Sequence, residues 1–224
     1  MNAKETRVTQ KRYDRQAALY DLKEVPVEFL GFKRLREMLW QSVKTGRLLE
    51  IGVGTGKNIP YHPEGARVVA LDISPKMLTR ATAKARREGR DVDLVLADAQ
   101  KLPFRDASFD GAAATFVFCS VPDAVRGLEE VKRVVKPEAG RIDLLEHVRS
   151  GSAVAGWVMD RLNPMVVRMM GANINRDTVG NVSRAGIEID EVESRGLGII
   201  KLIHGRPAES TSAPGRQGAV QHVA

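Results

Sequence analysis

Residues 48–58 read LLEIGVGTGKN, an apolar run that ends in a carboxylate and leads directly into glycines at every second position. The residues over Arg47–Val53 predict a buried strand, and Gly52, Gly54 and Gly56 predict a sharp turn at its carboxyl end. Doubly wound α/β sheets bind their ligands at that place. A tight strand-to-helix turn without any ligand is the alternative interpretation of the glycines alone.

The spacing around these glycines argues against two familiar nucleotide-binding loops. A P-loop has four residues between its first glycine and its Gly-Lys-Ser/Thr, but here Ile51 stands at the place of that first glycine and Asn58 replaces the hydroxyl side chain. The dinucleotide pattern G-x-G-x-x-G fails because residue 57 is lysine and the third glycine comes one residue early. Hydrolysis of ATP or GTP is therefore not expected, and a dinucleotide ligand is a weaker hypothesis.

The composition is typical of a globular protein. The chain has 224 residues, 43% of them hydrophobic and 28% charged, which suits one sizeable domain. A single cysteine, Cys119, excludes an intrachain disulfide and fits a reducing compartment, so we expect a soluble cytoplasmic protein. Residues 1–15 lack an apolar signal region, and no stretch approaches the roughly 20 apolar residues of a membrane span.

The formal net charge of +7 favours an anionic partner, such as a nucleic acid, a phospholipid surface or an acidic small molecule. Solubility alone is the alternative explanation, because the basic residues are spread over several segments.

After Gly46 the chain alternates candidate strands and helices. Apolar runs predict strands at 47–53, 66–72, 92–98, 109–117 and 140–147, with helices between them at 74–88 and 122–135. This alternation predicts a doubly wound α/β fold with a mainly parallel sheet. Two further β-like runs, 186–195 and 197–204, are too close together for a helical crossover and predict an antiparallel hairpin.

The remaining segments lie at the two ends of the chain. Helical spacing predicts helices over residues 5 to about 21 and 27–45, with Gly46 as the stop. We therefore expect N-terminal helices over 1–46, one ligand-binding domain over 47–205, and a disordered, proline-punctuated tail over 206–224.

Acidic residues follow three successive predicted strands. Glu50 ends the first, Asp72 ends the second, where it can accept both hydroxyls of a ribose, and Asp98 ends the third, where it can accept from an adenine amino group. Each acid alone is more often a helix cap or a solvated loop residue. Together they predict an adenosine-containing ligand without pyrophosphate.

Four segments in order, LLEIGVGTGKN, VVALDIS, LADAQKLPFRDASFD and EEVKRVVKPEAG, resemble motifs of class I S-adenosylmethionine-dependent methyltransferases of the UbiE-like kind. The resemblance covers roughly residues 10–205 and implies a Rossmann-like fold with a seven-stranded, mainly parallel sheet whose last strand is antiparallel. It implies S-adenosylmethionine as the cofactor, no metal, and N-terminal helices that cover the active site. One departure is Pro137-Glu138-Ala139-Gly140, where the family usually has Pro-Gly-Gly.

The resemblance also implies a set of site residues. The methionine part of the cofactor would be surrounded by the motif around Gly54 and by the segment after the fourth strand, the ribose would bind Asp72, and the adenine would bind Asp98 and Ala99. Ile73 and Met77 would pack on the adenine. The full set of expected cofactor residues is Glu50, Gly52, Gly54, Gly56, Asn58, Asp72, Ile73, Met77, Asp98, Ala99 and Phe116.

Two residues are expected near the reacting methyl group. Residues 13–21, YDRQAALYD, resemble the helix that lies over the cofactor in UbiE-like and phospholipid methyltransferases, which places Tyr20 near the sulfonium. An ordinary amphipathic helix is the alternative. His147, after the fifth strand, is a candidate general base, with a structural histidine as the alternative.

The acceptor is left open between several classes. The segments FVFCSVPD and LLEHVRS resemble the branch with phospholipid N-methyltransferases and animal thiol methyltransferases, which favours a lipid amine such as phosphatidylethanolamine. A small thiol, a quinone or another small molecule is the alternative acceptor. A nucleic-acid partner is not expected, because FVFCSVPD replaces the Asn/Asp-Pro-Pro-Tyr/Phe motif of amino-methylating DNA enzymes.

A methionine-rich segment, residues 153–170, contains four of the seven methionines. Such a segment can line an acceptor pocket, lie in a bilayer surface, or form an ordinary core helix, and periodicity does not separate these alternatives. Basic residues near the N-terminus, Lys4, Arg7, Lys11, Arg12 and Arg15, add an anionic membrane surface to the expected partners.

Overall fold

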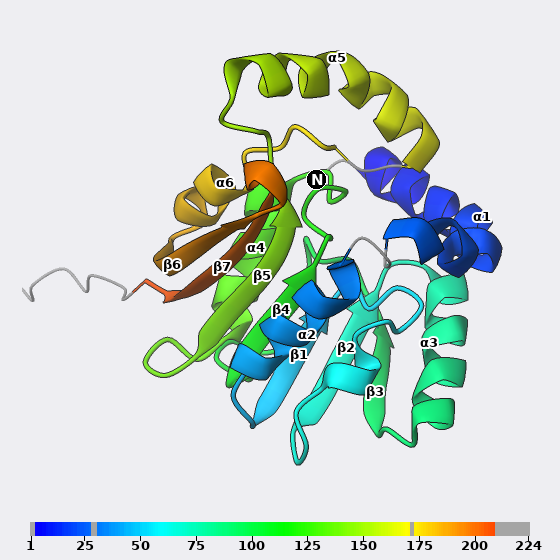
Figure 1. The fold of residues 1–224 in the computed structure, drawn as a ribbon. Helices are drawn as coiled ribbons and strands as arrows, with labels where there is room; N and C mark the ends of the chain where they lie inside the picture. The colour runs from blue at the N-terminus through cyan, green and yellow to red at the C-terminus, as the bar shows by residue number, and fades with distance from the viewer. Residues whose placement is uncertain (1–2, 28–30, 171–172, 209–224) are drawn as a thin grey trace, which may run out of the picture.

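The computed structural model describes residues 3–27, 31–170 and 173–208 (Figure 1). Its strands form one seven-stranded sheet in the order β3-β2-β1-β4-β5-β7-β6. The strands are β1 (Arg47–Ile51), β2 (Arg67–Asp72), β3 (Val92–Leu96), β4 (Gly111–Thr115), β5 (Arg141–His147), β6 (Ile187–Arg195) and β7 (Ile200–Pro207). Neighbours from β3 to β5 pair in parallel, whereas β7 is antiparallel to both β5 and β6. The predicted fold class and the C-terminal hairpin are confirmed.

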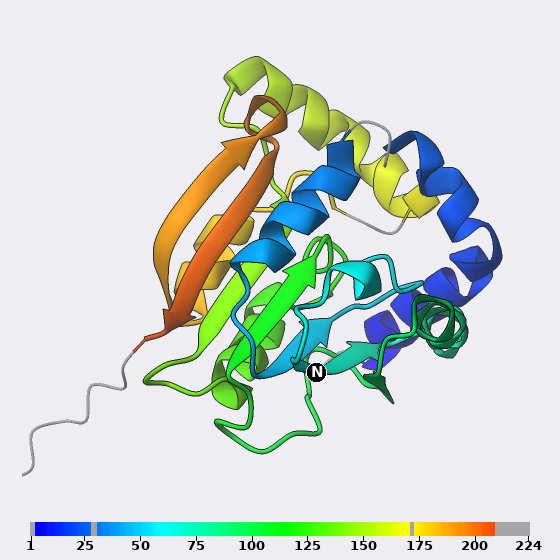
Figure 2. The ribbon, with the colours of Figure 1, turned by 60° about the horizontal axis from the view of Figure 1, so that its bottom comes forward.

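Helices cover both faces of this sheet. The helices are α1 (Ala3–Val27), α2 (Lys33–Ser42), α3 (Pro75–Glu88), α4 (Ala124–Val134), α5 (Ala153–Met170) and α6 (Thr178–Arg184), with short 3₁₀ turns η2 (Ile59–Tyr61) and η3 (Gly196–Gly198). Figures 1 and 2 show α2 on one face and α4 and α6 on the other. Alternate residues of the strands therefore face different cores.

Neighbouring side chains of β1 point into different cores, one on each face of the sheet. Leu48 packs with Trp40 of α2 and Ala81 of α3, whereas Leu49 packs with Leu128 of α4. Leu48 is 2% exposed, and the other four side chains are 1% exposed or less. Burial on both faces explains why the strands read as continuous apolar runs rather than as alternating ones.

Helices α3 and α4 each begin directly after a capping residue. Ser74 caps α3 by accepting a hydrogen bond from the backbone N–H of Met77 at 3.2 Å, and Pro75 is the first helical residue. Asp123 caps α4 by accepting from the N–H of Arg126 at 3.0 Å, so α4 begins after the predicted Pro122. Short polar side chains satisfy the first N–H groups of a helix, which places these residues outside the helix.

The ends of the chain differ from the predicted boundaries. α1 continues through Pro26 to Val27, beyond the predicted end near residue 21, and α2 ends at Ser42 rather than at Gly46. Gly46 instead leads into β1, where a Cβ on it would lie 2.8 Å from Oδ2 of Asp110. β7 includes residues 206 and 207, so the predicted tail begins too early, because these residues pair with β6. Residues 209–224 lie outside the described part.

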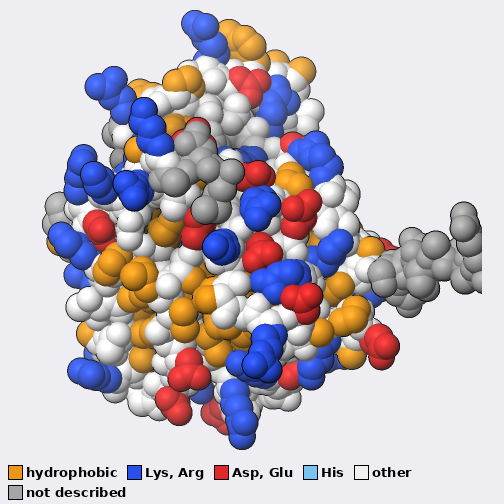
Figure 3. Space-filling view, turned by 180° about the vertical axis from the view of Figure 1, so that it is seen from behind, with side chains coloured by type: hydrophobic (Ala, Val, Ile, Leu, Met, Phe, Trp, Pro, Cys, Tyr) orange, Lys and Arg blue, Asp and Glu red, His pale blue; other side chains and the backbone are white. Residues whose placement is uncertain are grey.

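Charges are mixed on the surface. Figure 3 shows Lys and Arg side chains spread over the rear face with acidic side chains between them, so the net charge of +7 does not gather into one continuous basic surface on that face. Within the described residues, no helix has both the length and the apolarity needed to cross a membrane.

Candidate functional site

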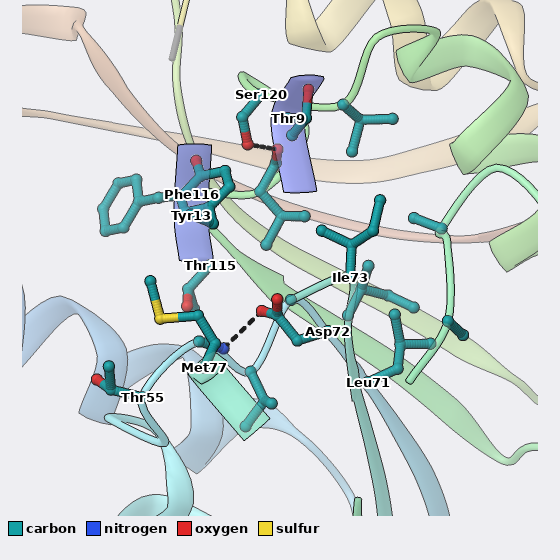
Figure 4. A pocket seen from close by; sticks show the side chains of 18 of the residues that line it. Thr9, Tyr13, Thr55, Leu71, Asp72, Ile73, Met77, Thr115, Phe116 and Ser120 are labelled. Atoms are coloured by element: carbon teal, nitrogen blue, oxygen red, sulfur yellow. Dashed lines mark hydrogen bonds between the residues drawn. The ribbon is translucent and has the colours of Figure 1, made fainter. Parts of the chain in front are cut away.

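A cavity of about 860 Å³, its open mouth included, lies at the carboxyl ends of β1, β2 and β4 (Figure 4). Thr9 and Tyr13 of α1 reach the cavity from the side opposite the strand ends. The predicted site residues that line it are Gly52, Gly54, Asn58, Asp72, Ile73, Met77, Asp98, Ala99 and Phe116.

The first two glycines of the turn after β1 have different surroundings. Gly52 and Gly54 adopt φ values of +67° and +56°, a conformation that side chains disfavour. A Cβ on Gly52 would lie 2.5 Å from Cγ2 of Val117, whereas a Cβ on Gly54 would have no heavy atom within 4 Å. Gly54 therefore presents bare backbone to open cavity, where a ligand can approach closely.

Gly56 does not line the cavity, contrary to the prediction. A Cβ on Gly56 would lie 2.7 Å from Cδ1 of Ile59 and 3.2 Å from Cα of Ala81. Its neighbours Thr55 and Lys57 do line the cavity, so it is the Cα of Gly56 that faces away, toward η2 and α3. The third glycine therefore permits close packing of the turn against α3.

Asp72 ends β2 and is tied to the glycine turn. Its Oδ2 accepts a hydrogen bond from the N–H of Gly54 at 2.9 Å (Figure 4). Its Oδ1 accepts from the N–H of Ser74 at 2.8 Å. Burial is the main cause that raises the pKa of Asp72 to about 6, and the charge of Glu50 adds a smaller rise. The backbone hydrogen bonds act in the opposite direction. The carboxylate is thus ionised at neutral pH and faces the cavity.

Asp98 lines the next part of the cavity and is held by polar neighbours. Its Oδ1 accepts from the N–H of Gln100 at 2.9 Å, and its Oδ2 accepts from the hydroxyl of Thr6 at 3.2 Å. Thr6 lies on α1, and Asp14 of the same helix accepts from the hydroxyl of Ser74 at 2.6 Å. α1 is therefore fastened across the cavity near both strand-end acids.

Apolar side chains separate the two acids. Ile73 and Met77 follow Asp72, and Ala97 and Ala99 flank Asp98; all four line the cavity. The arrangement forms an apolar slot with a carboxylate at each side, which suits a flat heterocycle joined to a sugar.

A buried cation lies at the far end of the cavity from Asp98. Arg36 of α2 is 8% exposed and lines the cavity, and its guanidinium donates to the hydroxyl of Thr115 at 2.8 Å and to Oδ1 of Asn58 at 3.3 Å. The Asn58 amide donates in turn to Glu50 at 2.7 Å. Arg36 was not predicted as a site residue, because helical spacing alone does not show that α2 lies over the strand ends.

Glu50 supports the cavity from behind and does not line it, contrary to the prediction. It is fully buried, and its two oxygens contact the Asn58 amide and Nε2 of His62, the latter at 2.8 Å. His62 was also missed from the sequence. Glu50 therefore orients Asn58, which does line the cavity.

The chain leaves β4 through a strained residue. Phe116 lines the cavity with a φ of +58°, in the left-handed region that non-glycine residues rarely occupy. Glu146 stabilises this turn, because its Oε1 accepts from the N–H groups of Val117 and Phe118, each at 2.9 Å. Burial raises the pKa of Glu146 to about 7. The predicted strand over 109–117 is therefore too long at its carboxyl end.

His147 lies behind Phe116. The two rings are 4.7 Å apart between centroids, and the ring of Phe32 is 5.6 Å from that of His147. Phe116 thus stands between the imidazole and the cavity, which His147 does not line. Tyr20 belongs to α1, but its side chain lies outside the described part; Tyr13, seven residues earlier on that helix, lines the cavity.

The single cysteine is buried in the same region. Cys119 is 2% exposed and donates to the carbonyl of Phe116 at 3.4 Å. Burial raises the pKa of its thiol far above the ordinary range, so the thiolate is not formed at neutral pH.

A glycine turn, two strand-end acids and an apolar slot at the carboxyl edge define an α/β domain built to hold a nucleoside. Residues 49–140 match the methyltransferase domain family. The chain therefore carries a methyltransferase domain, and the predicted relationship to S-adenosylmethionine-dependent methyltransferases is confirmed. The methyltransferase domain family implies S-adenosylmethionine as the cofactor.

Three curated relatives differ in their acceptors. A phosphatidylethanolamine N-methyltransferase from Cereibacter sphaeroides is 34% identical over 51% of this chain and 57% of its own length. A thiol S-methyltransferase from Homo sapiens is 31% identical over 69% and 64%, respectively. A demethylmenaquinone methyltransferase from Paenarthrobacter aurescens is 36% identical over 60% and 53%. The chain thus spans less than two thirds of the length of each of these relatives.

A solved structure shares the fold over nearly the whole chain. The SAM-dependent methyltransferase from Thermotoga maritima superposes with a TM-score of 0.67 at 22% identity, covering 89% of this chain and 99% of that one. At this identity the likeness establishes the fold alone.

Proposed function

We propose that this protein transfers a methyl group from S-adenosylmethionine to a small-molecule or lipid acceptor. The observation that carries the proposal is the position of Gly54, whose bare backbone faces open cavity next to the ionised Asp72. Isothermal titration calorimetry with S-adenosylhomocysteine tests it directly. Absence of binding, together with binding of a dinucleotide, would reject the assignment.

The cavity residues fit the parts of this cofactor. Asp72 would accept the two ribose hydroxyls, and Asp98 with Ala99 would receive the adenine between Ile73 and Met77. These roles follow from the carboxylates on either side of the apolar slot. They agree with the roles that the family resemblance implies.

Arg36 would bind the carboxylate of the methionine part. Its guanidinium lies in the cavity wall next to Asn58 and Thr115, at the glycine-turn end. A planar guanidinium pairs well with a carboxylate, and a pair in a largely buried site is strong. Glu50 would contribute by orienting Asn58 rather than by contact.

S-adenosylmethionine supplies a methyl group on a positively charged sulfur, and an amine that accepts it must lose one proton. The protein has to align the acceptor and exclude water. α1, fastened through Thr6 and Asp14, covers the cavity for this purpose. Phe116 would bound the acceptor side, because it separates the cavity from His147.

We keep Tyr20 and His147 as proposed residues of the acceptor side. A ring face or hydroxyl at position 20 would stabilise positive charge near the sulfur. His147 would take the acceptor's proton once the Phe116 ring, which separates it from the cavity here, turns aside, or it would hold that ring in place. Tyr20→Phe and His147→Ala should each lower kcat by more than they lower cofactor affinity; unchanged turnover would reject both roles.

For the acceptor, we propose the amine of phosphatidylethanolamine. Support comes from the Cereibacter sphaeroides relative, whose name gives that substrate, and from the basic residues of the chain. The second candidates are a small thiol and a quinone, which the names of the other relatives supply. We propose the cytoplasm as the compartment, since the one cysteine is a buried thiol.

Labelled cofactor distinguishes these acceptors. The full chain is incubated with vesicles containing phosphatidylethanolamine, with a small alkyl thiol, and with a demethylated quinol. Labelled lipid supports the first candidate. Label on the thiol or the quinol alone would replace it while leaving methyl transfer itself intact.

A further inference from the structure

Helix α5 exposes an apolar row to solvent. Five of its side chains are large, apolar and at least 41% exposed, with Trp157 at 62%. They are Val154, Trp157, Val158, Leu162 and Met165. Contiguous apolar surface of this kind marks an interaction site on a soluble domain. The core-helix interpretation of this segment is therefore wrong.

The row occupies one face of the helix. At about 100° per residue, the five side chains fall within an arc of about 140°. Arg161 and Arg168 lie within the same arc, and the guanidinium of Arg161 stands 6.0 Å from the ring centroid of Trp157. Asp160, the one acid in the α5 sequence, lies outside the arc and pairs with Arg149 at 2.9 Å. The exposed face thus combines apolar and basic side chains and carries no carboxylate.

The opposite side of α5 is attached to the rest of the fold. Asn163 accepts from the N–H of Ile174 at 2.9 Å and donates to Asn173 at 3.2 Å. The N–H of Asn173 donates to the carbonyl of Cys119 at 2.9 Å, in the segment that leads from β4 to the cavity wall. Gly156 is buried, with Arg149 close against it. These contacts fix the orientation of α5, so its apolar row faces outward.

Helix α1 adds positive charge on the same side of the sheet. Figures 1 and 2 show the C-terminal end of α5 beside α1. The exposed residues Lys4, Arg7, Lys11 and Arg15 fall within an arc of about 80° on α1. Figure 3 shows basic and hydrophobic side chains together over α5 at the top of the molecule.

We propose that the outer face of α5 docks onto an anionic lipid bilayer, with the basic stripe of α1 as an electrostatic aid. A helix with Trp, Val, Leu and Met on one face, and basic residues among them, suits the boundary between headgroups and acyl chains. The arginine stems lie along apolar surface while their guanidinium groups meet lipid phosphates. A soluble acidic partner would leave the apolar row unexplained. Docking concerns the surface on which the protein rests, so it goes beyond the proposed reaction.

Vesicle flotation tests the docking without cofactor, so its result does not depend on methyl transfer. The full chain should float with phosphatidylcholine vesicles that contain phosphatidylglycerol, and far less with phosphatidylcholine alone. Emission from Trp157 should shift to the blue on binding, while Trp40, 1% exposed, contributes a constant background. Raising the salt concentration should weaken binding.

Matched variants locate the surface. Leu162→Glu should reduce the vesicle partition coefficient at least tenfold, because it puts a charge into the apolar row. Leu96→Glu is the control, since Leu96 is a comparably exposed leucine on β3, at 55% against 45%. Arg161→Glu combined with Arg168→Glu should remove the preference for anionic vesicles.

Any of three vesicle results would overturn the proposal. They are no flotation with either vesicle, equal binding to neutral and anionic vesicles, and an equal loss of vesicle binding in Leu96→Glu. A concentration-dependent dimer in sedimentation velocity that Leu162→Glu abolishes would also overturn it, by assigning this face to a second copy of the chain. Binding of S-adenosylhomocysteine by each variant shows that it is folded.

Discussion

The backbone N–H of Gly54 donates a hydrogen bond to Oδ2 of Asp72 at 2.9 Å. This bond joins the glycine turn after β1 to the carboxylate that ends β2, so the two ligand-facing groups keep a constant separation. A side chain at residue 54 would project away from this bond into the open cavity, since nothing lies within 4 Å of a Cβ there.

Gly54→Val should abolish binding of S-adenosylhomocysteine, because its side chain fills the open cavity. Gly65→Val is the matched control: Gly65 also has a positive φ, +75°, and nothing within 4 Å of a Cβ, but it lies on an exposed loop. The backbone strain is therefore comparable in the two variants. Calorimetry should show binding lost only in the first; equal losses would mean that strain, and not the cavity, is responsible.

Cofactor affinity should depend on pH through Asp72. Its pKa of about 6 means that the carboxylate is ionised above that pH, and the ionised form accepts both ribose hydroxyls. Affinity for S-adenosylhomocysteine should be flat above about pH 6 and fall up to tenfold per pH unit below it. Asp72→Asn should bind more weakly and lose this dependence. A pH profile shared by both proteins would exclude Asp72 as its source.

The free energy of unfolding should respond to Asp72 in the opposite direction. Because burial raises this pKa above its ordinary 3.8, the folded state binds more protons than the unfolded state between about pH 4 and 6. This group's contribution to stability therefore decreases as the pH rises through that window. Urea unfolding of the ligand-free wild type and Asp72→Asn at several pH values isolates the difference, since the contribution of Glu146 is common to both.

Removal of the Arg36 guanidinium should weaken only ligands that carry a carboxylate. Arg36→Met should reduce affinity for S-adenosylhomocysteine by about 10- to 100-fold, the range of a hydrogen bond to a charged group. Affinity for methylthioadenosine, which lacks the amino-acid carboxylate, should change little. A similar loss for both ligands would show that Arg36 acts through the structure of the wall.

Glu146 should stabilise the turn at Phe116 through its oxygen and not through its charge. Glu146→Ala leaves the N–H groups of Val117 and Phe118 without their acceptor, which should lower the free energy of unfolding by about 2–4 kcal/mol. Glu146→Gln keeps a carbonyl oxygen there and should retain most of the stability. Urea denaturation measures both, and an equally unstable Gln variant would contradict this account.

Much of the sheet could be predicted because its strands are buried on both faces. The runs that form β2 and β4 are nearly continuous in apolar residues, and the glycines with Asp72 and Asp98 mark the strand ends at which the cavity lies. The seven-stranded sheet with its antiparallel last strand came from the family resemblance, and the strand order was not predicted, since local patterns carry no information about which strands are neighbours.

The missed parts depend on contacts between residues that are far apart in the sequence. Arg36 donates hydrogen bonds to Asn58 and Thr115, which lie 22 and 79 residues away in the sequence. The sequence of α2 alone does not indicate these partners. Gly56 was placed in the site by its motif, but the packing of α3 decides its role. The left-handed backbone of Phe116 likewise depends on a distant residue. Glu146 accepts from the N–H groups of Val117 and Phe118, which precede it by 29 and 28 residues.

The two hydrogen bonds that fasten α1, from Thr6 to Asp98 and from Ser74 to Asp14, have a kinetic consequence. They cross the apolar slot near both of its acidic sides, so α1 narrows the route by which a nucleoside would enter and leave. Weakening either attachment should therefore speed exchange of the nucleoside while admitting water to the reacting groups.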